Sequence, residues 1–100
     1  MIELTWTVPM AHPAFAGHFP ERPILPGVVL LDQAIRLTAS ALPPDTAIQG
    51  LGNAKFFQPV PPGTLLRFRL PPATPTAQTF EILSGDQVVA SGSLSLATRP

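Results

Sequence analysis

The sequence has no cysteine and few charged residues, and each shortage excludes a class of protein. Without cysteine, the chain can form neither disulfide bonds nor thiolate metal sites. Its formal net charge is zero, so it lacks the basic excess that neutralises phosphates, and we expect no nucleic-acid partner. No apolar run approaches the roughly 20 residues of a membrane span. Residues 1–5 do not have the pattern of a signal peptide, and we therefore expect a cytoplasmic protein.

Length and composition predict a small protein that associates with copies of itself. The 100 residues fit one domain, expected to span residues 1–100, and 45% of them are hydrophobic. Only 12% are charged, which is about half the usual share. So little charge leaves apolar surface that a subunit interface would cover. We therefore expect a homodimer or a higher homo-oligomer.

Fourteen prolines divide the chain into short elements. Proline ends helices and is excluded from central strands, so proline clusters mark connections. A long loop is predicted over residues 9–26, and a loop of this length in a small domain is usually functional. A helix over residues 28–42 follows Pro26 and Gly27 and ends before Pro43. It is apolar on nearly every side, which predicts that it is buried.

The other elements are predicted to be strands. They cover residues 3–8, 46–57, 65–70, 79–83 and 88–97. The second should bend at Gly50 or Gly52, and Gly85 with Asp86 suits a tight hairpin turn between the last two. One helix followed by an antiparallel sheet is an α+β arrangement. A sheet wrapped around one long buried central helix, at about 28–42, is a hot-dog fold.

The most informative segment runs from His18 to Asp32. It places a histidine in a proline-rich loop and a carboxylate inside an apolar helix. Histidine titrates near neutral pH and can transfer protons in either direction. A carboxylate in an apolar helix is costly unless it is paired or used. The two residues form a general acid–base pair if the fold brings them together.

Two sequence blocks resemble the 3-hydroxyacyl-[acyl-carrier-protein] dehydratases of the hot-dog superfamily. The chain is most similar to their small Asp-bearing members from polyene-type pathways. The first block contains His18-Phe19-Pro20, Pro23, Pro26-Gly27-Val28 and Leu31-Asp32. The second contains Ala54-Lys55-Phe56-Phe57, Pro59-Val60 and Pro62-Gly63. Asp32 follows His18 by fourteen residues, which is the interval of the family.

The resemblance implies dehydration of a 3-hydroxyacyl thioester in fatty acid or polyene-type biosynthesis. His18 would take the proton from C2. Asp32 would give a proton to the leaving hydroxyl group at C3, directly or through water, or would hold His18 and a water molecule in place. Backbone N–H groups at the helix start, at Gly27 and Val28, would bind the thioester oxygen, where negative charge grows. The substrate would be carried by acyl carrier protein or coenzyme A, with no cofactor and no metal ion. His18 and Asp32 of one site would come from different subunits.

Other interpretations remain open at this point. Asp32 and Arg36 are four residues apart, so Asp32 could form a plain helix ion pair. Phe56 and Phe57 are most simply core residues, although they could line an acyl tunnel. The alternative functions are a hot-dog acyl thioesterase, in which a helix carboxylate activates water, and a non-catalytic acyl-binding hot-dog protein. Thioesterases lack the loop histidine in this context, which favours the dehydratase.

Overall fold

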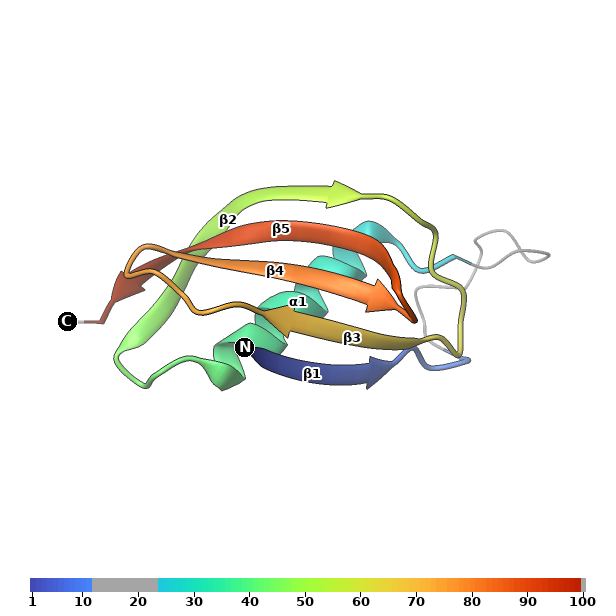
Figure 1. The fold of residues 1–100 in the computed structure, drawn as a ribbon, viewed down its shortest axis with the longest axis horizontal. Coiled ribbons are helices and arrows are strands. Elements are labelled where there is room, and N and C mark those ends of the chain that lie inside the picture. The colour runs from blue at the N-terminus through green and yellow to red at the C-terminus, as the bar shows by residue number, and fades with distance from the viewer. Residues whose placement is uncertain (12–23, 100) are drawn as a thin grey trace.

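The computed structural model describes residues 1–11 and 24–99 of the chain. In these residues one helix and five strands follow one another. Their bounds are Ile2–Thr7 for β1, Gly27–Ala41 for α1, Thr46–Phe56 for β2, Leu65–Leu70 for β3, Ala77–Ser84 for β4 and Gln87–Thr98 for β5. The strands form one antiparallel sheet in the order β1-β3-β4-β5-β2 (Figure 1). The α+β prediction is therefore confirmed.

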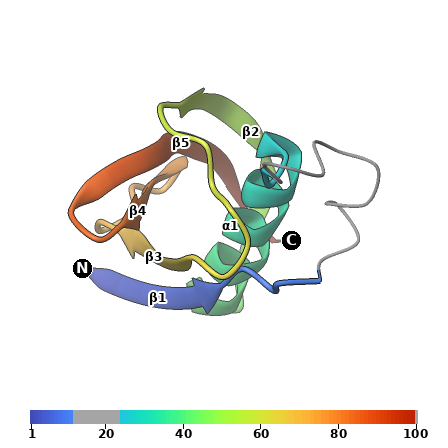
Figure 2. The same cartoon turned by 90° about the vertical axis from the view of Figure 1, so that its right-hand side faces the viewer.

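The sheet curves around α1, and the helix lies along its concave side. Viewed end on, β1 and β2 are the two margins of the curved sheet and α1 lies between them (Figure 2). The helix contacts β2 and β3, which lie toward opposite margins. This is the hot-dog arrangement expected from the sequence.

The core lies between the concave side of the sheet and one side of the helix. Leu30, Ala34 and Thr38 are the buried residues of α1, and their spacing of four places them along one face. The largest fully buried side chains of the sheet face this row: Phe68, Phe80, Leu66, Ile82 and Leu94. Burial of this apolar surface is the main force that fixes the helix on the sheet.

Prolines set the limits of α1. The carbonyl of Pro26 accepts hydrogen bonds from the N–H groups of Val29 and Leu30, at 3.0 and 3.4 Å. At the other end, Leu42 is extended and Pro43 follows it. The helix begins and ends one residue earlier than the predicted 28–42. Gly27 already belongs to it, and Leu42 is extended because the residue before a proline disfavours the helical conformation.

The sheet covers α1 on one side only. Val28 is 71% exposed, and Asp32 and Arg36 on the same outward face are exposed as well. The apolar composition predicted that the whole helix is buried. In the structure, burial is confirmed for the side that faces the sheet and not for the outward side. Within residues 1–11 and 24–99, no other element covers the outward face.

Strand β2 bends as its glycines predicted. Its register against β5 shifts between Ile48 and Gly50 and again between Leu51 and Asn53. The strand lies at one margin of the sheet, so its second edge pairs with none of the described strands. The turn from β4 to β5 also follows the prediction, since Gly85 has a φ of +59°, which glycine adopts without strain.

Most of the predicted loop over residues 9–26 lies outside the residues that the structure describes, and His18 lies there too. Within residues 1–11 and 24–99, no helix has the length and apolar character that crossing a membrane requires.

Candidate active site

The start of α1 presents backbone N–H groups that no described residue binds. The first N–H groups of a helix have no partner within the helix. Pro26 precedes Gly27 and provides no side-chain cap. Among the described residues, the N–H groups of Gly27 and Val28 have no hydrogen-bond acceptor. These are the two residues for which the sequence predicted oxyanion binding, and free donors at a helix start suit that role.

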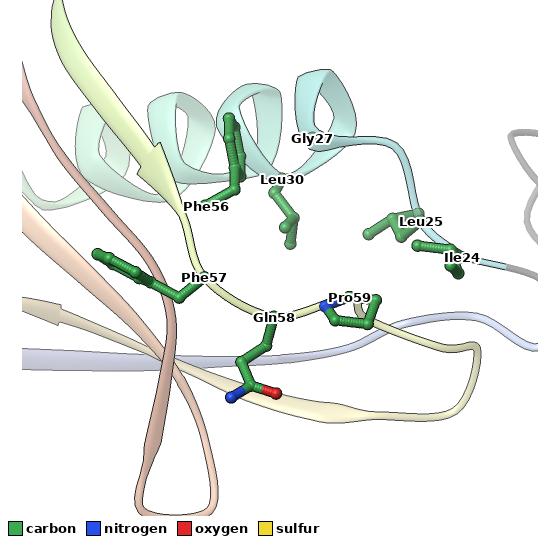
Figure 3. A pocket seen from close by; sticks show the side chains of 8 residues that line it. All are labelled: Ile24, Leu25, Gly27, Leu30, Phe56, Phe57, Gln58 and Pro59. Atoms are coloured by element: carbon green, nitrogen blue, oxygen red, sulfur yellow. The ribbon is translucent and has the colours of Figure 1, made fainter.

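An open apolar pocket of about 500 Å³ lies beside this helix start (Figure 3). The helix and the segment before it form one wall, and the end of β2 with the segment after it forms the other. The lining residues are Ile24, Leu25, Gly27, Leu30, Phe56, Phe57, Gln58 and Pro59. Such a pocket suits the apolar part of an acyl chain, with a few polar groups to orient it.

Phe56 and Phe57 belong to this pocket and not to the core. They are 50% and 56% exposed, so the simplest prediction, that they are core residues, is wrong. Their position explains the difference, because β2 ends at Phe56 at the margin of the sheet, where no further strand of the described residues lies. The alternative prediction, that some of these aromatic residues line an acyl site, agrees with the pocket.

The fold brings the two predicted sequence blocks together. The N–H of Leu25, just before the helix, donates to the carbonyl of Val60 at 2.8 Å. The N–H of Phe57 donates to the carbonyl of Val89 in β5 at 2.9 Å, which fixes the second block on the sheet. Five lining residues were not predicted as site residues, although Pro59 belongs to the second block: Ile24, Leu25, Leu30, Gln58 and Pro59. Their place in the pocket follows from the tertiary contact between the two blocks.

Asp32 lies on the outward face of α1, one turn after Val28. The Nε of Arg36 donates to its Oδ2 at 2.8 Å, and the Asp32 side chain is 59% exposed. The ion pair considered from the sequence is therefore present. An exposed pair of this kind stabilises a helix by only about 0.3–0.5 kcal/mol. Helix stability is therefore a weak explanation for the presence of this ion pair. Neither Asp32 nor Val28 lines the pocket beside Gly27.

His18 lies outside the described residues, and its distance from Asp32 stays a prediction. Lys55 is exposed on β2. The described part of the site thus consists of free backbone donors, an apolar pocket and an exposed carboxylate held by a guanidinium group.

Comparison with known proteins identifies the family. The profile of ApeI-like dehydratases, described as "ApeI dehydratase", matches residues 1–93. The 3-hydroxyacyl-[acyl-carrier-protein] dehydratase FabZ of Chlamydia muridarum is 37% identical over 101 aligned residues. That alignment covers 88% of this chain and 66% of the relative, so the chain spans just under two thirds of the relative's length.

Solved structures agree with this match. The dehydratase heterocomplex ApeI:P from Xenorhabdus doucetiae superposes with a TM-score of 0.80 at 26% identity, over 95% of this chain and 85% of that one. An uncharacterised protein from Erwinia carotovora subsp. atroseptica superposes with a TM-score of 0.77 at 35% identity, over 96% and 82% of the two chains. The resemblance noted in the sequence is confirmed, and the chain belongs to the ApeI-like dehydratase family of hot-dog proteins.

Proposed function

We propose that this protein dehydrates a 3-hydroxyacyl thioester to the trans-2-enoyl thioester. The observation that carries the proposal is the uncapped start of α1, which opens on an apolar pocket one turn before an exposed carboxylate. Its membership of a dehydratase family and its similarity to enzymes named 3-hydroxyacyl-[acyl-carrier-protein] dehydratase support the same reaction. The preferred carrier is acyl carrier protein, with coenzyme A as the alternative.

The chemistry needs a base, an acid and a site for negative charge. Neutral His18 takes a proton from C2, and charge then develops on the thioester oxygen. The N–H groups of Gly27 and Val28 bind that oxygen, where fixed donors in an apolar setting are most effective. Asp32 gives a proton to the departing hydroxyl group, directly or through water, or it orients His18 and that water. One water molecule leaves, and the double bond forms between C2 and C3.

The active form is a homodimer in which each site takes His18 from one subunit and Asp32 from the other. Two features support association. The outer edge of β2, which pairs with none of the described strands, can pair with a strand of a second copy, since unpaired edges are templates for further pairing. Beside that edge, Leu51 is 48% exposed and Phe56 is 50% exposed, and Val28 projects from the outward face of α1. A second copy over this side would cover these side chains.

The protein acts in fatty acid or polyene-type biosynthesis in the cytoplasm, as one domain over residues 1–100. It needs no cofactor or metal ion for this chemistry, because protein side chains supply both proton transfers.

The test uses purified protein and a series of 3-hydroxyacyl thioesters of different chain lengths, attached to acyl carrier protein or to coenzyme A. Mass spectrometry follows the substrate. Loss of one water with the thioester intact supports the proposal, and the ratio of rates identifies the carrier. Release of the free carrier thiol would identify a thioesterase. A bound but unchanged acyl chain would identify a non-catalytic acyl-binding protein, and either result would contradict the proposal.

A further inference from the structure

A second charged side chain stands beside the proposed acid. Arg36 Nε donates to Asp32 Oδ2 at 2.8 Å, and the two side chains are 72% and 59% exposed. Both lie on the outward face of α1, away from the buried row of Leu30, Ala34 and Thr38. The ion pair therefore takes no part in the packing of the helix on the sheet. In the proposed function, Asp32 would meet the substrate on this exposed face.

The pair holds one carboxylate oxygen and leaves the other open. Among the described residues, Oδ1 of Asp32 accepts no hydrogen bond. An aspartate side chain rotates about two bonds, and an exposed one samples several orientations. A donor fixed on Oδ2 restricts that rotation and leaves Oδ1 free for a substrate hydroxyl or a water molecule. The order of Asp32 and Arg36 along the helix also favours the ion pair, because the acidic residue lies nearer the positive N-terminal end of the helix dipole.

Arg67 forms the second described ion pair of an arginine, and its contacts are those of a structural residue. Its Nη1 donates to Glu3 Oε1 at 2.8 Å and its Nη2 donates to the carbonyl of Gly85 at 2.6 Å. Arg67 thereby connects β1, β3 and the turn between β4 and β5. Arg36 makes no second hydrogen bond within residues 1–11 and 24–99, and exposed pairs of this type add little stability. The one described polar partner of Arg36 is the proposed acid.

We propose that Arg36 is a positioning residue that holds the Asp32 carboxylate in the orientation needed for dehydration. The inference rests on the proposed function, in which Asp32 serves the leaving hydroxyl group. Small misplacements of a reacting group reduce rates strongly, even when substrate binding is unchanged. Arg36 does not line the apolar pocket, so it should influence kcat and leave KM nearly unchanged.

The experiment compares Arg36→Gln, Arg36→Lys and Arg36→Ala with the matched control Arg67→Gln, whose ion pair has the same length and lies on the outer face of the sheet. Arg36→Gln should lower kcat by about tenfold or more with KM within about twofold. Arg36→Lys should recover part of kcat, and methylguanidinium added to Arg36→Ala should restore part of it. Arg67→Gln should keep kcat and melt at a lower temperature, and methylguanidinium should not change its rate.

The outcomes separate this inference from the proposed function. If Asp32→Asn is inactive while Arg36→Gln keeps full kcat, the positioning role is wrong and the proposed function stands. If kcat falls but neither lysine nor methylguanidinium restores any of it, the loss does not come from the missing contact and the inference also fails. A rise in KM at constant kcat would place Arg36 in substrate binding and overturn it too. If Asp32→Asn is fully active, the proposed function itself fails.

Discussion

The ring of Phe56 lies against the backbone of Gly27, although the two residues are far apart in sequence. A Cβ atom on residue 27 would be only 2.9 Å from two carbon atoms of that ring. Glycine therefore lets the aromatic wall of the pocket approach the helix start, where the free N–H groups lie. The proposed oxyanion site and the acyl pocket meet at this contact.

Substitution of Gly27 by alanine should disturb the site and leave the fold intact. Alanine is favourable in a helix, but its methyl group forces the Phe56 ring to move. We expect kcat/KM to fall by about tenfold or more in Gly27→Ala, because a displaced wall misplaces the thioester. The double variant Gly27→Ala/Phe56→Leu, which removes the obstructing ring, should recover part of the activity. An unchanged rate in Gly27→Ala would show that this contact does not matter for catalysis.

Much of the fold could be predicted because it depends on local signals. Prolines and glycines marked the connections, and alternating residues marked the strands, so even the bends in β2 and the turn at Gly85 were anticipated. The contact of Phe56 with Gly27 could not be predicted, since it arises only when the end of β2 packs beside the helix start. The face of α1 that packs on the sheet could not be predicted either, because apolar residues occur on nearly every side of this helix.

Asp32 offers a test that separates catalysis from helix stability. Asp32→Asn keeps the size of the side chain but removes the acid, and we expect severe loss of activity. Asp32→Glu retains the acid one methylene further out and should keep partial activity. Loss of the exposed pair should reduce the free energy of unfolding by only about 0.5 kcal/mol, as urea denaturation would measure. Full activity in Asp32→Asn would leave Asp32 as an ion-pair residue only.

Replacement of Thr38 by valine should stabilise the fold. The residue is 1% exposed on the sheet-facing side of α1, and its Oγ1 has no hydrogen-bond partner among the described residues. A buried hydroxyl without a partner is unfavourable, and valine has nearly the same shape without it. We expect Thr38→Val to raise the free energy of unfolding by about 1 kcal/mol in urea denaturation. Thr38→Ala, which also removes a methyl group, should be less stable than Thr38→Val. A loss of stability in Thr38→Val would mean that the hydroxyl is satisfied after all.

Leu51 tests the proposed subunit interface. It is 48% exposed on β2, beside the free strand edge, whereas Leu65 is 56% exposed on β3, near the other margin of the sheet. A charge buried in an interface without a partner is costly, so Leu51→Glu should shift the dimer toward monomer in sedimentation experiments. Leu65→Glu, a matched change at a comparably exposed leucine, should leave the dimer intact. Equal behaviour of the two variants would place the interface elsewhere.

The most direct test of the account mixes two inactive variants and measures dehydration. His18→Ala and Asp32→Asn should each be inactive as homodimers. If each site combines His18 of one subunit with Asp32 of the other, a mixed dimer contains one intact site and one doubly altered site. Co-refolding should then restore about a quarter of wild-type enoyl-thioester formation, provided that pairing is random and the sites are independent. No recovery, with mixed dimers demonstrated by mass, would contradict the shared His18–Asp32 site.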